Sequence, residues 1–202
     1  MARILLSILC LYSSLPSKSQ EIDTRISNQI DLLKKSNIDT IFLYAIQGAG
    51  EIILISDSCY TDEDQYLFYM KSDRCFLKRF DNCKIYPAVL LDSNPFLFYF
   101  RNKIIIDKDE IKPPTYFTTK KGKRFKVISS TDHTCFYEMV IFLKEKKVFK
   151  KTNDYDLNTK MADAGKRNIY YYRNRKTKFY EFLNQLDAVI NRLKTSNKIL
   201  QE

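Results

Sequence analysis

The sequence predicts an α+β fold: a mainly antiparallel sheet built of hairpins, with an N-terminal and a C-terminal amphipathic helix packed on it. Three observations predict it. Short apolar runs alternate with turn residues through the middle of the chain. Apolar residues recur at helical spacing near both ends. The 202 residues contain no internal repeat that would favour a solenoid or a propeller.

The two helices are predicted from apolar residues that recur every three or four positions. Near the N-terminus, this spacing predicts a helix over residues 21–36, and near the C-terminus it predicts a longer helix over 179–193. The residues that set the spacing are Ile22, Ile26, Ile30 and Leu33 in the first helix, and Phe179, Phe182, Leu183, Leu186, Val189, Ile190 and Leu193 in the second.

The strands are predicted from apolar runs on either side of short polar or glycine turns. The first pair, 41–46 and 52–55, is apolar without alternation, so we expect its strands to be covered on both faces. Three further hairpins are expected over 66–70 with 75–80, 115–119 with 124–129, and 134–143 with 147–151, and a last strand over 168–173.

One segment between these hairpins has two interpretations. Asn94 before Pro95 is a helix-start pattern, which predicts a short helix over 95–102. The aromatic run 96–100 would also suit a strand. Lys112-Pro113-Pro114 ends the segment in either case.

The N-terminus has the parts of a secretory signal peptide. Arg3 precedes an apolar run of about 12 residues, shorter than the ~20 that a membrane-spanning helix needs, and small residues before Gln20 suit cleavage there. We therefore expect residues 1–19 to be removed and 20–202 to form a single exported α+β domain, periplasmic or extracellular, with no transmembrane segment. Lipid anchoring at Cys10 is disfavoured because the bulky Leu9 precedes it. The alternative is that 1–19 is a buried first strand or helix.

Positive charge is concentrated in one third of the chain. Residues 118–178 hold 17 Lys and Arg against 6 Asp and Glu, a net charge of +11, whereas residues 20–117 have a net charge of −3. Such asymmetry favours an anionic partner: a glycan, a lipid head group or an acidic protein. Nucleic acid is disfavoured because the chain is expected to be exported. The alternative is a set of solvated turns and strand edges.

Two basic clusters within this third are the predicted binding residues. Arginine suits phosphate and carboxylate, and tyrosine rings can stack on sugars or bases. The clusters contain Lys120, Lys121, Lys123 and Arg124, and Lys166, Arg167, Tyr170, Tyr172, Arg173 and Arg175.

His133 and Cys135 are the candidates for catalysis, as a thiol nucleophile with its base. In a strand, however, Cys135 would share a face with Tyr137 and Met139. This alternation predicts instead that Cys135 is a core residue and that His133 marks the start of the strand.

Metal and disulfide sites are predicted less specifically. Asp57, Asp62 and Asp64 offer oxygen ligands, but their spacing fails the EF-hand pattern. No C-x-x-C pair occurs, which argues against a zinc ribbon or a thioredoxin-type site. Four cysteines remain after signal removal, so three complete disulfide pairings are conceivable. They are Cys59, Cys75, Cys83 and Cys135.

No nucleotide-binding or hydrolase motif occurs, so we expect no cofactor. The leading functional hypothesis is a non-enzymatic exported domain that binds or scaffolds through residues 118–178. The alternatives are a small exported hydrolase or thiol enzyme centred on His133 and Cys135, and a secreted basic effector that acts on nucleic acid.

Overall fold

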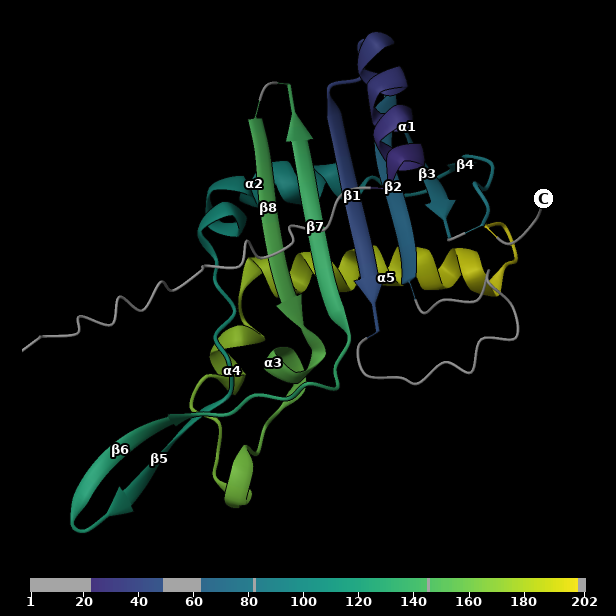
Figure 1. The fold of residues 1–202 in the computed structure, drawn as a ribbon. Helices are drawn as coiled ribbons and strands as arrows, with labels where there is room; N and C mark the ends of the chain where they lie inside the picture. Colours follow the sequence, from purple (N-terminus) through teal and green to yellow (C-terminus); the bar gives the residue numbers. More distant parts are fainter. Residues whose placement is uncertain (1–22, 49–62, 82, 145, 200–202) are drawn as a thin grey trace, which may run out of the picture.

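The computed structural model describes residues 23–48, 63–81, 83–144 and 146–199 (Figure 1). Its main sheet has six antiparallel strands in the order β4-β3-β2-β1-β7-β8, and a separate two-stranded sheet pairs β5 with β6. The strands are β1 (Thr40–Gln47), β2 (Glu63–Lys71), β3 (Arg74–Phe80), β4 (Val89–Leu90), β5 (Thr115–Lys120), β6 (Lys123–Ile128), β7 (Phe136–Leu143) and β8 (Lys146–Asn153).

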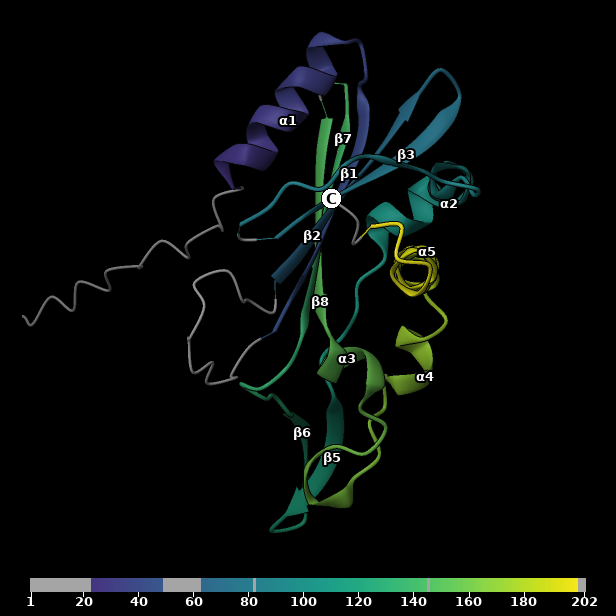
Figure 2. The same ribbon diagram turned by 90° about the vertical axis from the view of Figure 1, so that its right-hand side faces the viewer.

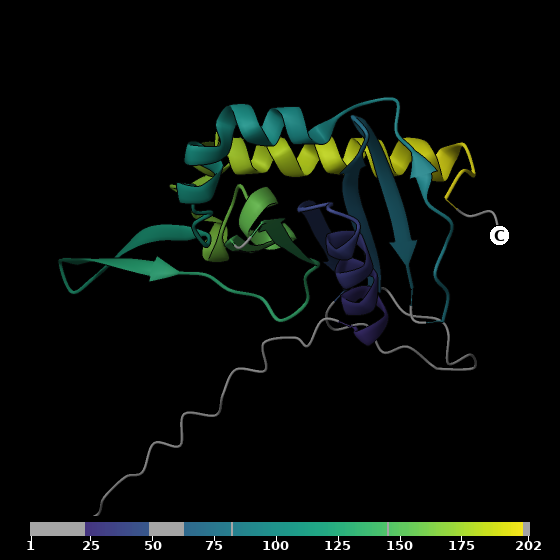
Figure 3. The ribbon, with the colours of Figure 1, turned by 90° about the horizontal axis from the view of Figure 1, so that it is seen from above.

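Helices cover both faces of the main sheet. α1 (Thr24–Lys35) lies on one face, and α2 (Pro95–Lys108) and α5 (Lys178–Thr195) lie side by side on the other (Figures 2 and 3). Phe42 of β1 belongs to the core under α2 and α5, and its neighbour Leu43 belongs to the core under α1. This arrangement confirms the predicted α+β class and explains why β1 is apolar without alternation.

Aromatic rings fill the larger of the two cores. The Phe42 ring lies 4.1 Å from that of Phe96 in α2 and 5.6 Å from that of Phe182 in α5, measured between centroids. Tyr99 contacts both Phe42 and Phe182. The sheet and its two covering helices are therefore held together by one cluster of large side chains, which stabilises the fold mainly by apolar burial.

The helix start predicted at Asn94 and Pro95 is confirmed by its capping bond, whereas α1 begins at Thr24 rather than at the predicted residue 21. Asp23 accepts a hydrogen bond from the Arg25 backbone N–H at 2.8 Å, and Asn94 accepts one from the Phe96 N–H at 3.0 Å. α2 then continues to Lys108, so the strand alternative for 96–100 is wrong. The predicted strand 52–55 lies outside the described residues.

The predicted last strand over 168–173 is wrong. Asn168 accepts a hydrogen bond from the Tyr170 N–H, and the chain then enters the short helix α4 (Tyr171–Asn174). Two more short elements, α3 (Asp154–Asn158) and a 3₁₀ turn at Asp163–Gly165, precede it. The chain here needs compact turns because β8 must be connected to α5 across the lower end of the sheet (Figure 1).

Two features of the outline bear on function. The β5–β6 hairpin projects from the body of the protein (Figure 1). In the main sheet, the outer strands are β4, which has two residues, and β8, which carries four lysines. None of the described helices has the length and hydropathy to span a bilayer.

Candidate anion-binding surface

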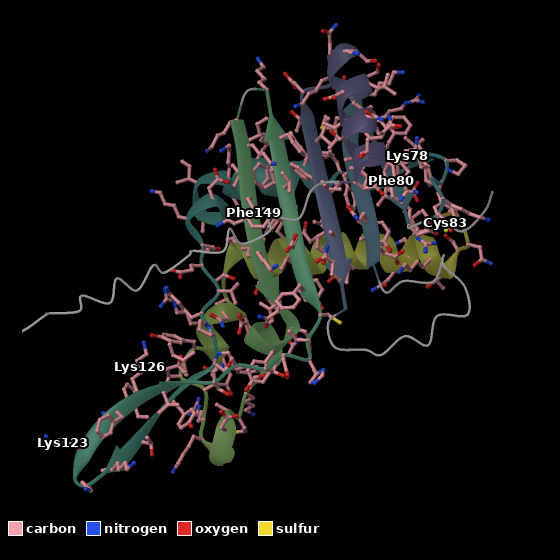
Figure 4. All side chains as sticks on the ribbon, viewed as in Figure 1. Lys78, Phe80, Cys83, Lys123, Lys126 and Phe149 are labelled. Carbon is pink, nitrogen blue, oxygen red and sulfur yellow. The ribbon has the colours of Figure 1, made fainter. Side chains whose placement is uncertain are left out.

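The projecting hairpin carries the first basic cluster. Lys121 and Gly122 form its two-residue turn with φ of 51° and 73°, the left-handed conformation that tight hairpin turns of type I′ require at both positions. Lys123 lies towards the outer end and Lys126 nearer the body (Figure 4). All five basic residues of the hairpin are exposed, and the hairpin has no acidic residue.

The hairpin base is fixed to the second basic cluster by one buried side chain. Asn168, 1 % exposed, accepts a hydrogen bond from the Thr115 N–H at 3.1 Å and donates one to the Thr159 carbonyl at 2.8 Å. The Ile169 N–H in turn donates to the Thr115 carbonyl at 2.8 Å. Segment 166–176 therefore lies beside the base of the hairpin, as Figure 1 also shows, so the two predicted clusters adjoin.

Cations and rings alternate where the two clusters meet. The Arg124 guanidinium carbon lies 3.8 Å from the centre of the Phe117 ring, and Phe117 is the cross-strand partner of Lys126. The Lys126 ammonium donates a hydrogen bond to the Tyr170 hydroxyl at 3.2 Å, and the Arg173 guanidinium lies 5.7 Å from the Tyr170 ring. We call this group the basic–aromatic surface; its residues are Phe117, Arg124, Lys126, Tyr170 and Arg173.

Short helix α4 and its flanks extend the same alternation. Arg167 lies 5.2 Å from the Tyr172 ring, and Tyr172 contacts Tyr171 edge to face at 5.1 Å. Arg175 lies 5.4 Å from the Tyr171 ring and 5.1 Å from that of Tyr180. The rings position the cations by cation–π attraction, which is worth ~0.5–1 kcal/mol at exposed sites.

The described acids engage these cations only weakly: Lys112 and, to a smaller extent, Arg173 lower the pKa of the exposed Glu110 carboxyl. Within the described part of the chain, no ion pair joins a carboxylate to any predicted binding residue. By contrast, Asp107 of α2 forms ion pairs with two lysines, Lys103 of the same helix and Lys146 of β8. The basic–aromatic surface is therefore electrostatically available to an external anion.

The predicted clusters are only partly brought together. Cross-strand partners share a face of a hairpin and successive residues alternate, so Lys120 and Lys123 lie on the opposite face from Arg124 and Lys126. Lys126 and Phe117 were missed by the sequence prediction. Both could have been predicted from the register of the hairpin. Side chains alternate between its two faces, and Phe117 and Lys126 are cross-strand partners on the same face as Arg124.

His133 and Cys135 precede β7 rather than lie within it. The strand begins at Phe136, so the prediction that Cys135 is a core residue is wrong: Cys135 is exposed. The Cys135 carbonyl accepts a hydrogen bond from the Asp154 N–H, which turns the chain away from the sheet at this point. The His133 side chain is 70 % exposed, and its Nε2 atom lies 3.6 Å from the Asp132 carboxylate. Neither residue lines the pocket beside β3 and β4 or the pocket between β7 and α5, and a thiol mechanism stays a hypothesis.

Asp64 belongs to β2 and is fully engaged by protein groups. It accepts hydrogen bonds from Tyr66, Arg79 and Lys194 at 2.7–2.9 Å. Burial opposes its ionisation, but these donors outweigh burial and lower the pKa of Asp64. Asp57 and Asp62 lie outside the described residues, and no group of three potential metal ligands occurs within them.

The four cysteines divide into two kinds. The structure places Cys75, buried on β3, and the exposed Cys135 outside any disulfide, and which cysteines pair stays a prediction. Cys83 is a half-cystine, and Cys59 lies outside the described residues. Burial raises the pKa of the Cys75 thiol, which makes this thiol a poor nucleophile.

Comparison with known proteins gives no relative. No protein family, no curated protein and no solved structure matches this chain.

Proposed function

We propose that this protein is an exported, non-enzymatic binding protein whose basic–aromatic surface holds an acidic glycan. The observation that carries the proposal is the run Arg124–Phe117–Lys126–Tyr170–Arg173, in which cations stacked on rings face solvent and form no ion pair with a carboxylate of the described residues. Guanidinium and ammonium groups bind carboxylate or sulfate, and rings pack against the apolar faces of sugars.

The shape and the chemistry of the hairpin favour a glycan over a lipid surface. Its turn consists of Lys121 and Gly122 between further cations, so the part that extends farthest has no apolar side chain to insert into a bilayer. The phenylalanines lie behind this turn, where they can contact a chain laid along the hairpin. Nucleic acid offers the same anionic charge, but the predicted signal peptide removes the chain from the compartment where nucleic acid is abundant.

Removing two charges from the basic–aromatic surface tests the proposal. Arg124→Ala with Lys126→Ala should weaken binding of a polygalacturonate fragment about tenfold, ~1.4 kcal/mol, and should flatten the dependence of affinity on salt. Isothermal titration calorimetry at two salt concentrations measures both. The matched control is Lys35→Ala with Lys71→Ala, which removes the same charge from exposed positions elsewhere.

Three results would contradict the proposal. Equal weakening by the control pair would mean that net charge alone attracts the glycan. Tighter binding of single-stranded DNA of matched charge would favour the nucleic-acid alternative. Tighter binding of vesicles that contain anionic lipid would favour a membrane surface.

A further inference from the structure

A small pocket opens where the lower end of β7 meets α3 and α5. Its volume is about 190 Å³, the space of roughly six water molecules. This is smaller than a pocket for a drug-sized ligand and suits one compact ring. Its lining is mostly polar: Tyr137, Asn158, Tyr180, Asn184 and Asp187, with Leu157 and Leu183.

Asp187 supplies a carboxylate to this pocket at a cost to the fold. Its Oδ1 accepts a hydrogen bond from the hydroxyl of the buried Tyr44 at 2.8 Å, its one hydrogen bond within the described chain. Burial raises the pKa of Asp187, against the smaller opposing effects of Tyr44 and of Lys194. A carboxyl group held where its charge is penalised, with its second oxygen unused and a pocket beside it, is typical of a functional position.

Three other polar side chains of the pocket, Tyr137, Tyr180 and Asn184, are also unused within the described residues, whereas Asn158 is bonded to Arg175 and Asp154. Asn184 lies one helical turn before Asp187 on α5 and is exposed, and its amide has no hydrogen bond within the described residues. The hydroxyls of Tyr137 and Tyr180 likewise have none there. Burial raises the pKa of Tyr137 to about 12, so its hydroxyl stays protonated at neutral pH and can donate. Acceptors and donors therefore surround the pocket, as hydroxyl groups of a ligand require.

The residues around the pocket distinguish between two classes of ligand that tyrosines and a carboxylate could hold, one with an ammonium group and one with an acidic group. An ammonium group of a ligand would suit the tyrosine rings and the Asp187 carboxylate. However, a cation of the protein, Arg175, already contacts two residues that line the pocket. Its guanidinium is 5.1 Å from the Tyr180 ring and donates a hydrogen bond to Asn158 Oδ1 at 3.1 Å. A cation held on two lining residues attracts a carboxylate of the ligand to that side of the pocket and repels an ammonium ion there.

We propose that the pocket holds a single uronic-acid residue, with its hydroxyls bonded to Asp187 and Asn184 and its carboxylate directed to Arg175. This inference rests on the proposed glycan-binding function, and it names the sugar class and a second contact point. Arg175 is linked through Tyr171 and Tyr172 to Arg167, which belongs to the second basic cluster.

Saturation-transfer NMR with the methyl glycosides of galacturonate, glucuronate and mannuronate, and with neutral methyl galactoside, tests the pocket directly. At least one uronate should bind the full chain. Asn184→Ala, which changes an exposed side chain, should weaken it about fivefold, ~1 kcal/mol. Asp187→Asn, which keeps an acceptor for the Tyr44 hydroxyl, should also weaken binding of the uronate. Arg175→Ala should remove the preference for the uronate over the neutral sugar.

The matched control is Asn191→Ala, an exposed asparagine on α5 that does not line the pocket; it should bind as the parent does. If no uronate binds while polygalacturonate still binds through the hairpin, the pocket inference fails and the proposed function stands. If a uronate binds and depends on Asn184 while the hairpin variants leave polygalacturonate affinity unchanged, the pocket stands and the proposed function fails. Equal uronate affinity of the Asn184 variant and the parent would also overturn the inference.

Discussion

Asp187 and Asp64 are two carboxylates in one polar network with opposite consequences for stability. The two are linked through the cross-strand pair Tyr44 and Tyr66, whose hydroxyls donate to Asp187 and Asp64 respectively. Asp64 also receives Lys194 and Arg79, so its ionised form is favoured in the folded state. Burial disfavours the ionised form of Asp187, and the smaller opposing effects of Tyr44 and Lys194 do not offset it.

Asp187→Asn should therefore stabilise the protein at neutral pH. Burial raises the folded-state pKa of Asp187 above the ordinary aspartate value of 3.8, so its charge costs stability at pH 7. That cost disappears as pH falls through the folded-state pKa and towards 3.8. The variant, whose amide oxygen still accepts from Tyr44, should show a higher Tm at pH 7 and a smaller difference at pH 3. A difference that is equal at both pH values would mean that the buried charge is not its cause.

Individual site residues could be predicted from the sequence only where their neighbours are local. The cations of the hairpin were found because Lys120 to Arg124 are contiguous, and Arg173 and Arg175 because they flank a tyrosine run. The pocket residues come from positions 137, 158 and 180–187, and nothing in the sequence shows that these positions meet. Cys135 was placed one residue inside β7 because alternation does not mark where a strand begins.

At the scale of the elements, the helix α5 and three of the four predicted hairpins followed from periodicity and turn residues. Segment 168–173 and the pairing of 41–46 with 52–55 did not, since β1 pairs with β2 and β7. Three consecutive tyrosines between cations fit a strand by propensity. The deciding contact is Asn168, which accepts from Thr115, a residue 53 positions away, and from Tyr170 two positions on. Tertiary context of this kind overrides local propensity and is absent from any window of the sequence.

Asn168→Ala should loosen the β5–β6 hairpin from the body. The substitution leaves the Thr115 N–H, the Tyr170 N–H and the Thr159 carbonyl without their partner, so we expect a loss of about 2–4 kcal/mol in the free energy of unfolding. Hydrogen exchange should accelerate at Thr115 and Tyr170 and stay unchanged in α1. Asn168→Asp, which keeps the acceptor oxygen, should protect both amides better than alanine does. Uniform acceleration through the whole chain would instead indicate that Asn168 supports the entire fold.

At the scale of the molecule, the state of the cysteines in the isolated protein would test the predicted compartment. Disulfides persist in oxidising surroundings, and Cys83 is a half-cystine whereas Cys75 and Cys135 are not. If residues 1–19 are removed, Cys59 is the one cysteine left to pair with Cys83. The signal peptide and the disulfide are therefore linked predictions.

Mass spectrometry of protein secreted by a bacterial host should test both. The intact mass should lack residues 1–19, and non-reducing peptide mapping should join Cys59 to Cys83. Cys135, which is exposed, should react with an alkylating reagent in the folded state, and Cys75, 4 % exposed, only after unfolding. A retained Met1 together with four reactive thiols would contradict export.

The outer strand β8 has a further consequence for a protein that binds a polymer. Copies held close together along one glycan would reach a high local concentration, the condition under which open sheet edges join into aggregates. Lys146, Lys147, Lys150 and Lys151 on β8 make such joining costly, because a second β8 would bring eight like charges into contact. Crowding on the ligand would then leave neighbouring copies separate and able to dissociate one at a time.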